Sequence, residues 1–136
     1  MAEQAARIMV VDDEATARVS LAEILRLEGY RVATAASGEE ALSLLNKSGP
    51  FDLMVLDIKM PGMDGIELLQ TIKQEDPDTE VIMITGHGDM ELAIESLKYE
   101  ATDFVTKPIN DDVLEIALKR AHEKKDMSRQ IRQYTE

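Results

Sequence analysis

A chain of 136 residues with 44% hydrophobic content is long enough for one domain with a buried core, and we expect one main domain. The net charge of −12 argues against the basic surface that binds nucleic acid or anionic membranes, and no apolar run reaches the roughly 18 residues that span a bilayer. With no cysteine, disulfides and thiolate chemistry are excluded. The first residues lack a secretory-signal pattern, so we expect a cytoplasmic protein without nucleic-acid or membrane partners.

The first predicted strand, residues 7–12, is followed by a helix that ends near Gly29. The strand ends on two adjacent carboxylates, Asp12 and Asp13. At about 4 Å and an effective dielectric constant near 20, two such charges repel by roughly 4 kcal/mol. We therefore expect a nearby group to offset them.

The second predicted strand covers residues 30–35, and the next helix begins at Ser37, with a capping box completed by Glu40. The third strand, residues 51–57, runs into the loop IKMPGMDG, whose Pro and Gly residues are typical of a turn. The third helix opens at Gly62 or Asp64 and stops before a proline.

The fourth strand, residues 80–85, precedes a helix from about residue 89 with the apolar positions Leu92, Ala93 and Leu97. The fifth strand covers residues 102–107, and a fifth helix starts near residue 110. Alternating strands and helices with near-continuous apolar strands predict an α/β fold, with a mostly parallel sheet covered by helices on both faces.

Polar residues end four of these strands, and in such sheets ligands bind beyond the carboxyl ends of the strands. The residues are Asp12, Asp13, Asp57, Thr85 and Lys107. Taken alone, each is more often a turn or cap residue than a ligand. Together, three carboxylates require a neutralising cation, and hard oxygen ligands in this number suit Mg²⁺.

The same edge offers what a bound phosphoryl group needs. Lys107 and Thr85 supply a cation and a hydroxyl, and Gly86 presents its backbone N–H without a side chain in the way. Asp57 ends the central strand and is the best candidate for the phosphoryl acceptor. His87 lies beside this site and has two interpretations, a loop histidine without chemistry or a residue that tunes the access of water.

Four motifs carry a resemblance to a known family over residues 7–122. These are VVDDE, DLMVLDIKMPGMDGIELL, VIMITGHGD and DFVTKPI, in family order and at family spacing. The chain resembles a response-regulator receiver domain of two-component signalling, and ITGHGDMELAIESLK resembles receivers of NtrC-type enhancer-binding regulators. The resemblance implies a flavodoxin-like, doubly wound, five-stranded parallel sheet in the order 2-1-3-4-5.

The resemblance also implies the roles of the site residues. Asp57 would accept a phosphoryl group from a sensor histidine kinase or a phosphotransfer protein, so the domain would be a signalling phosphoacceptor rather than an enzyme. Asp13 and Asp57 would ligate Mg²⁺ together with the backbone carbonyl of Lys59, and Asp12 would hold a metal-bound water. Thr85 would hydrogen-bond the phosphoryl oxygen.

The resemblance further implies that Lys107 pairs with the phosphoryl group and that the Lys107–Pro108 bond is cis. Phe104 matches an aromatic switch position whose ring turns inward when Thr85 moves. We expect the face formed by helix four, strand five and helix five to change partners or form a homodimer, and so to control an output domain or partner, most simply in transcription regulation.

Two features depart from a minimal receiver. Glu100 stands where the family often has glycine, and a non-glycine residue is expected to strain that turn. Residues 123–136 are expected to continue helix five beyond a receiver domain of residues 1–122. The spacing of Met127, Ile131 and Tyr134 fits either a dimer seam or a solvated helix, and we expect His122 to be solvated.

Three alternatives share parts of this pattern. A flavodoxin-like cofactor binder needs a Ser-, Thr- or Gly-rich phosphate loop after the first strand, where this chain has DDEAT. A haloacid-dehalogenase-type phosphatase needs a second aspartate at the position of Lys59. A degenerate receiver that acts without phosphorylation remains the third alternative, although every expected site residue is present.

Overall fold

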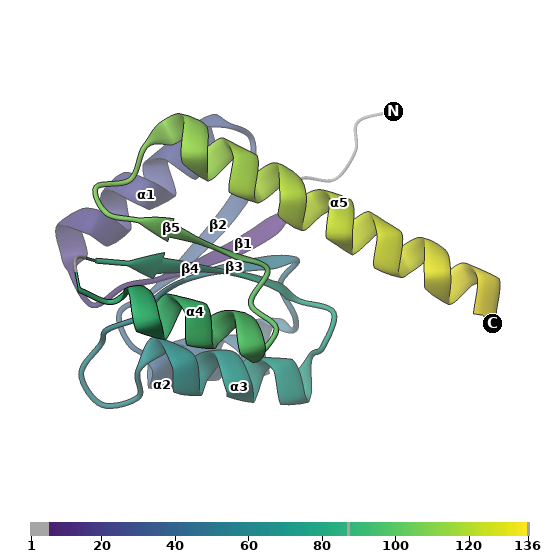
Figure 1. Ribbon diagram of the computed structural model, residues 1–136, viewed down its shortest axis with the longest axis horizontal. Helices are drawn as coiled ribbons and strands as arrows, with labels where there is room; N and C mark the ends of the chain where they lie inside the picture. The colour runs from purple at the N-terminus through teal and green to yellow at the C-terminus, as the bar shows by residue number, and fades with distance from the viewer. Residues whose placement is uncertain (1–5, 87, 136) are drawn as a thin grey trace.

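The computed structural model of the chain describes residues 6–86 and 88–135, with side chains as far as Met127. Strands and helices alternate throughout (Figure 1). The strands are β1 (Arg7–Val11), β2 (Arg31–Ala35), β3 (Leu53–Asp57), β4 (Glu80–Thr85) and β5 (Asp103–Thr106). The helices are α1 (Ala15–Leu27), α2 (Gly38–Ser48), α3 (Gly65–Glu75), α4 (Met90–Lys98) and α5 (Asp111–Thr135).

The strands form one five-stranded parallel sheet in the order β2-β1-β3-β4-β5, which confirms the predicted topology. Every residue of β3 and β4 is buried. Parallel strands covered on both faces read as continuous apolar runs, which is why these two strands have no alternating pattern. The carboxyl ends of β1, β3 and β4 therefore meet at one edge of the molecule.

Helices cover both faces of the sheet (Figure 1). On one face, Leu25 of α1 and Leu118 of α5 pack in a buried cluster with residues such as Ile8 and Ile82. On the other face, α2, α3 and α4 contribute to a second buried cluster, in which Leu69 is completely enclosed. Burial of side chains of this size stabilises the fold by roughly 2 kcal/mol each, so the sheet is a rigid support for its edge.

The starts of α2 and α3 were predictable from their capping residues. The Ser37 hydroxyl accepts a hydrogen bond from the Glu40 N–H at 3.1 Å, and the Asp64 carboxylate accepts one from the Glu67 N–H at 2.9 Å. Each bond satisfies an N–H that the first helical turn leaves without a partner. Asp64, rather than Gly62, is therefore the residue that starts α3.

The predicted apolar face of α4 was partly wrong. Of the residues in this fully described helix, Ala93 and Ser96 are buried, whereas Leu97 is 42% exposed. Ala93 and Ser96 are three positions apart and face the sheet together, and Leu97 is turned a further 100° around the helix. Ser96 tolerates this place because its hydroxyl donates to the Ala93 carbonyl at 2.5 Å.

The long helix α5 continues past the sheet (Figure 1). His122 is not solvated as predicted, because its Nε2 lies 2.8 Å from the Tyr30 hydroxyl and the two rings stack. Met127 is exposed, and the side chains of Ile131 and Tyr134 lie outside the described residues. Within the described ranges, no helix has the length and apolar character needed to cross a membrane.

Candidate functional site

Three carboxylates gather at the carboxyl edge of the sheet. Asp12 and Asp13 follow β1, Asp57 ends β3, and one oxygen from each lies within 4.8 Å of the others. Asp12 and Asp57 are buried, whereas Asp13 is exposed. The cluster is thus enclosed by protein around Asp12 and Asp57 and open to solvent at Asp13. Three hard oxygen donors with an open side fit a Mg²⁺ ion, which retains waters and leaves positions for phosphate oxygens.

Asp57 is held at this place by the loop after β3. The Ile58 N–H donates to the Ile84 carbonyl at 2.9 Å, and the Gly65 N–H donates to the Ile58 carbonyl at 2.8 Å. A Cβ on Gly65 would clash with the Asp57 carbonyl oxygen and lie 2.8 Å from Ile58 Cα. Gly65 thus allows the first turn of α3 to lie against the end of β3, a requirement that the sequence analysis did not identify.

Charges of both signs act on Asp57. Its pKa is raised from 3.8 to about 6, first by burial and then by the negative charge of Asp12, while Lys107 acts in the opposite direction. The Lys107 ammonium lies 3.5 Å from Asp57 Oδ2. Asp12 is oriented by the Glu14 N–H, which donates to its Oδ1 at 2.9 Å. The site therefore has more negative charge than Lys107 alone can balance, and a bound cation would relieve it.

Thr85, Gly86 and Lys107 lie at the carboxyl ends of β4 and β5. Thr85 ends β4 and is fully buried, with its hydroxyl 3.4 Å from the Gly86 carbonyl. The Lys107 N–H donates to the Thr85 carbonyl at 2.8 Å, which ties the end of β5 to the end of β4. The Lys107–Pro108 peptide bond is cis. The structure thus brings the predicted cation and hydroxyl to the same edge as the three carboxylates.

Phe104 lies on β5 opposite Met83, two residues before the position that pairs with Thr85. Since side chains alternate along a strand, Phe104 and Thr85 point to the same face of the sheet, the face covered by α4. The Phe104 ring is half-buried and packs against the apolar cluster on that face. His87 lies outside the described residues.

Lys59 makes a contact that the sequence analysis missed. Its ammonium lies 2.9 Å from Oδ1 of Asp89, a nearly buried carboxylate at the start of α4. From the sequence, Asp89 is predicted only to be the start of a helix. A lysine and an aspartate thirty positions apart give no local signal that they pair.

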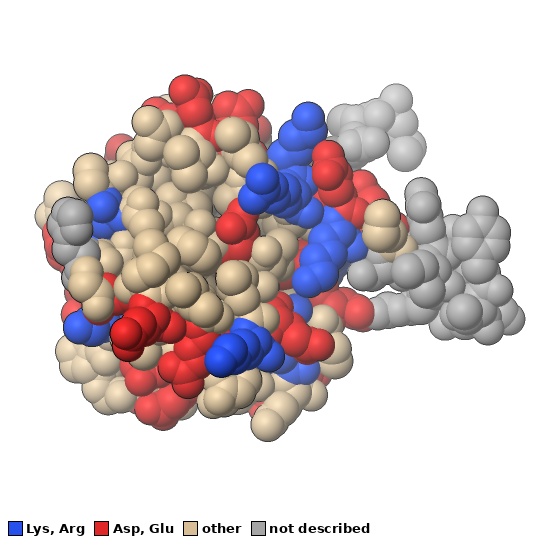
Figure 2. Space-filling model, in the orientation of Figure 1, with Lys and Arg blue, Asp and Glu red and all other residues tan. Residues whose placement is uncertain are grey.

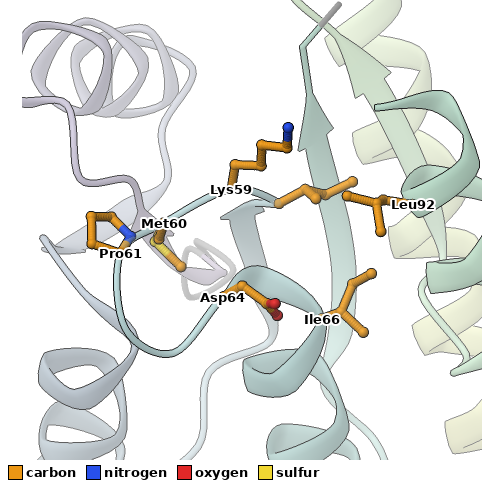
Figure 3. Close-up of a pocket in the computed structure, with 7 residues that line it drawn as sticks. Lys59, Met60, Pro61, Asp64, Ile66 and Leu92 are labelled. Atoms are coloured by element: carbon orange, nitrogen blue, oxygen red, sulfur yellow. The ribbon is translucent and has the colours of Figure 1, made fainter. Parts of the chain in front are cut away.

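A groove of about 410 Å³ separates the loop after β3 from the first turn of α4 (Figure 3). In Figure 3, Ile66 of α3 and Leu92 of α4 lie on one side of it and Met60 and Pro61 lie on the other. Its lining residues are Ile58, Lys59, Met60, Pro61, Asp64, Ile66 and Leu92. The groove leaves space beside α4 close to the carboxylate cluster.

The fold and the site together define a class of signalling domain. Residues 8–119 match the family model described as response regulator receiver domain. The chain belongs to the response regulator receiver domain family.

The comparisons also show which receivers are similar. The nitrogen assimilation regulatory protein NtrX of Azorhizobium caulinodans is 41% identical over 93% of this chain, which covers 28% of that protein. Sporulation initiation phosphotransferase F of Bacillus subtilis is 39% identical, over 84% of this chain and 91% of that protein. The predicted likeness to NtrC-type regulators is confirmed by relatives such as NtrX, although the chain spans less than a third of their length.

Solved structures agree with these relatives. NtrX from Brucella abortus superposes with a TM-score of 0.89 at 39% identity, covering 96% of this chain and 29% of that one. A response regulator receiver domain protein from Clostridium thermocellum gives a TM-score of 0.85 at 35% identity, covering 90% of this chain and 98% of that one. The second comparison shows a whole chain of nearly this size with the same fold.

Proposed function

We propose that Asp57 accepts a phosphoryl group from a phosphohistidine on a sensor kinase or phosphotransfer protein, in a reaction that depends on Mg²⁺. The observation that carries the proposal is the cluster of three carboxylates within 4.8 Å, with Lys107 at 3.5 Å from Asp57. A carboxylate oxygen of Asp57 forms the new bond to phosphorus, and the bond between phosphorus and the histidine nitrogen breaks, leaving that electron pair on the imidazole.

The residues around Asp57 have separate tasks. Asp13, Asp57 and the backbone carbonyl of Lys59 would hold Mg²⁺, and Asp12 would hold a water of its shell. The ion supplies positive charge that neutralises the carboxylates and the phosphoryl oxygens. Lys107 pairs with the phosphoryl group through a charge-assisted hydrogen bond, which is stronger than a hydrogen bond between neutral groups.

Thr85 and Gly86 complete the contacts to the phosphoryl group through a hydroxyl and a backbone N–H. His87 remains a candidate for limiting the access of water to the acyl phosphate. The family is one of signalling phosphoacceptors, and we propose that the chemistry of this chain is limited to self-catalysed phosphotransfer and slow loss of the phosphoryl group.

Phosphorylation would be detected by a partner at the surface formed by α4, β5 and α5. Movement of Thr85 towards the phosphoryl group would draw the Phe104 ring inward and change the surface above it. That surface carries exposed apolar side chains, and Figure 2 shows uncharged residues gathered over it, with charged residues along its margins. The exposed apolar side chains of this surface are those of Met90, Ile94, Leu97, Val113 and Ile116. We propose that a second copy of the chain or a partner binds there.

The whole protein would then regulate transcription, like the regulatory proteins to which the chain is similar, and it would act in the cytoplasm. Residues 1–122 would act as the receiver domain, and residues 123–136 would lead towards an output domain.

Intact-mass measurement after incubation with a small phosphodonor tests this proposal. The wild-type chain should gain one phosphoryl group with Mg²⁺ and none with a chelator. Asp57→Asn should gain none under either condition, because an amide does not attack phosphorus in this way.

A matched control is Asp64→Asn, which makes the same chemical change in the loop that follows Asp57. Asparagine caps helices as well as aspartate does, so this variant should fold and be labelled like the wild type. Labelling of Asp57→Asn at the wild-type rate would refute the proposal. A folded wild type that binds Mg²⁺ and gains no phosphoryl group would instead favour a module that acts without phosphorylation.

A further inference from the structure

The ion pair between Lys59 and Asp89 joins the loop after β3 to the start of α4. Lys59 lies two residues after the acceptor Asp57, and Asp89 immediately precedes α4. The Lys59 side chain is 69% exposed, whereas the Asp89 side chain is 9% exposed. A nearly buried carboxylate is costly to leave unpaired, so this contact fixes Asp89 more than an ordinary surface ion pair would.

Asp89 occupies the N-cap position of α4 without acting as a cap. Its carboxylate makes no capping hydrogen bond, although aspartate is among the best capping residues. Its backbone has φ −107° and ψ 16°, whereas Ser37 and Asp64 cap their helices from extended conformations. The carboxylate that would bind the Leu92 N–H is held by Lys59 instead.

The surroundings of α4 leave room for a different arrangement. Within this fully described helix, the side chains of Ala93 and Ser96 are the buried ones. The groove of about 410 Å³ separates Leu92 from the loop that carries Lys59. The first turn of α4 is thus lightly packed, and the ion pair is a polar link across the groove.

We infer that the Lys59–Asp89 ion pair is a latch that keeps α4 uncapped until Asp57 is phosphorylated, an inference that rests on the proposed function. A phosphoryl group adds nearly two negative charges. At most roughly 7 Å of backbone separates the Cα atoms of Asp57 and Lys59. The ammonium therefore moves to the phosphoryl oxygens, Asp89 is released, and its carboxylate caps α4 at the Leu92 N–H. The accompanying rotation of the Asp89 backbone changes the direction in which α4 starts.

The test is the amide hydrogen exchange of Leu92, measured by NMR with Mg²⁺ before and after a phosphodonor, with intact mass recorded on the same samples. In the wild type, phosphorylation should slow this exchange by about five-fold, the effect of one capping bond. Lys59→Met should already show the slow exchange without the phosphodonor. In Asp89→Ser, the serine caps α4 without an ion pair, so the Leu92 amide should exchange slowly both before and after phosphorylation.

Lys98→Met is the matched control, since it removes an exposed lysine at the other end of α4 and should behave like the wild type. Fast exchange of Leu92 in unphosphorylated Lys59→Met would overturn the latch. So would a wild type whose mass shows full phosphorylation while Leu92 exchanges as before. A wild type that is never phosphorylated would contradict the proposed function, and the Lys59→Met comparison would still decide whether the ion pair prevents capping.

Discussion

The charge on Asp57 is set by burial and Asp12 on one side and by Lys107 on the other. The balance raises its pKa to about 6 from 3.8. In the metal-free protein, the folded state therefore binds more protons than the unfolded state between about pH 4 and pH 6. The free energy of unfolding falls as pH rises through this window, because Asp57 must ionise next to Asp12. The same excess of negative charge that lowers stability is what the proposed Mg²⁺ would neutralise.

Asp57→Asn should remove this contribution. Two pKa units correspond to roughly 3 kcal/mol, and partial hydration of the site lowers the expected gain at pH 7 to about 1–2 kcal/mol. We expect the variant to be more stable than the wild type at pH 7 in chelator, and the difference to disappear near pH 4. Urea unfolding of both proteins across this range measures it. A constant difference at every pH would show that Asp57 titrates normally.

At the scale of single elements, two helices end in the same hydrogen-bond pattern with different residues. In α4 the Ala101 N–H donates to the Ser96 carbonyl and the Glu100 N–H to that of Leu97, both at 3.1 Å. Among the described residues, Glu100 is the non-glycine residue with a positive φ, at 73°. The expected strain at this turn is therefore present. The end of α1 has the same pattern with Gly29, at φ 99°.

Glu100→Gly should therefore raise the free energy of unfolding by roughly 1 kcal/mol, since glycine adopts this conformation without steric cost. Gly29→Ala is the reverse change at the equivalent position of α1. A Cβ there meets no atom within 4 Å, so its expected loss of roughly 1 kcal/mol is purely conformational. Urea unfolding midpoints give both values. A destabilised Glu100→Gly would mean that the Glu100 side chain makes a compensating contact.

The helix α5 is attached to the sheet beyond the proposed boundary at residue 122. Lys124 lies 3.7 Å from Glu80, a buried carboxylate that also accepts a hydrogen bond from the Thr102 hydroxyl at 2.7 Å. The Lys125 ammonium donates to the Asp78 carbonyl at 2.8 Å. The start of the extension is therefore part of the packed domain rather than a free linker.

Lys124→Met should lower the free energy of unfolding by about 1 kcal/mol, because it leaves the charge of Glu80 buried with less compensation. Lys119→Met, on an exposed part of the same helix, should change it by less than about 0.5 kcal/mol. Thermal or urea unfolding of the two variants, measured at low and at high salt, distinguishes their effects. Equal effects for the two variants would place the extension outside the cooperative unit.

At the scale of the whole molecule, phosphorylation should convert the chain to a dimer through the face of α4, β5 and α5. Ile116 on this face is 53% exposed, and Val19 on α1 is 52% exposed. Ile116→Ser should abolish the phosphorylation-dependent increase in mass measured by sedimentation, whereas Val19→Ser should retain it. If both variants still dimerise, the interface lies elsewhere, and the C-terminal helix becomes the next candidate.

The sheet and the convergence of the site residues could be predicted because they depend on local patterns. Continuous apolar strands define the layers, and the carboxyl ends of parallel strands bring Asp12 and Asp57 together whatever the loops do. The resemblance to receivers added the strand order, which periodicity alone does not fix.

The contacts that were missed depend on the tertiary arrangement. Lys59 and Asp89, like Tyr30 and His122, carry no local sequence signal that they pair, because only the fold brings them together. Leu97 was placed wrongly because α4 buries only a narrow stripe, and helical periodicity does not give the width of the buried face. These contacts lie around α4 and α5, where small differences in packing decide which side chains are exposed.

The most direct test of the central claim is to map the phosphorylated residue. After phosphorylation with Mg²⁺, borohydride reduces an aspartyl phosphate to homoserine, which peptide mass spectrometry locates in the sequence. We expect homoserine at position 57 and at no other aspartate. Homoserine at position 12 or 13, or a phosphoryl group that borohydride does not remove, would contradict it.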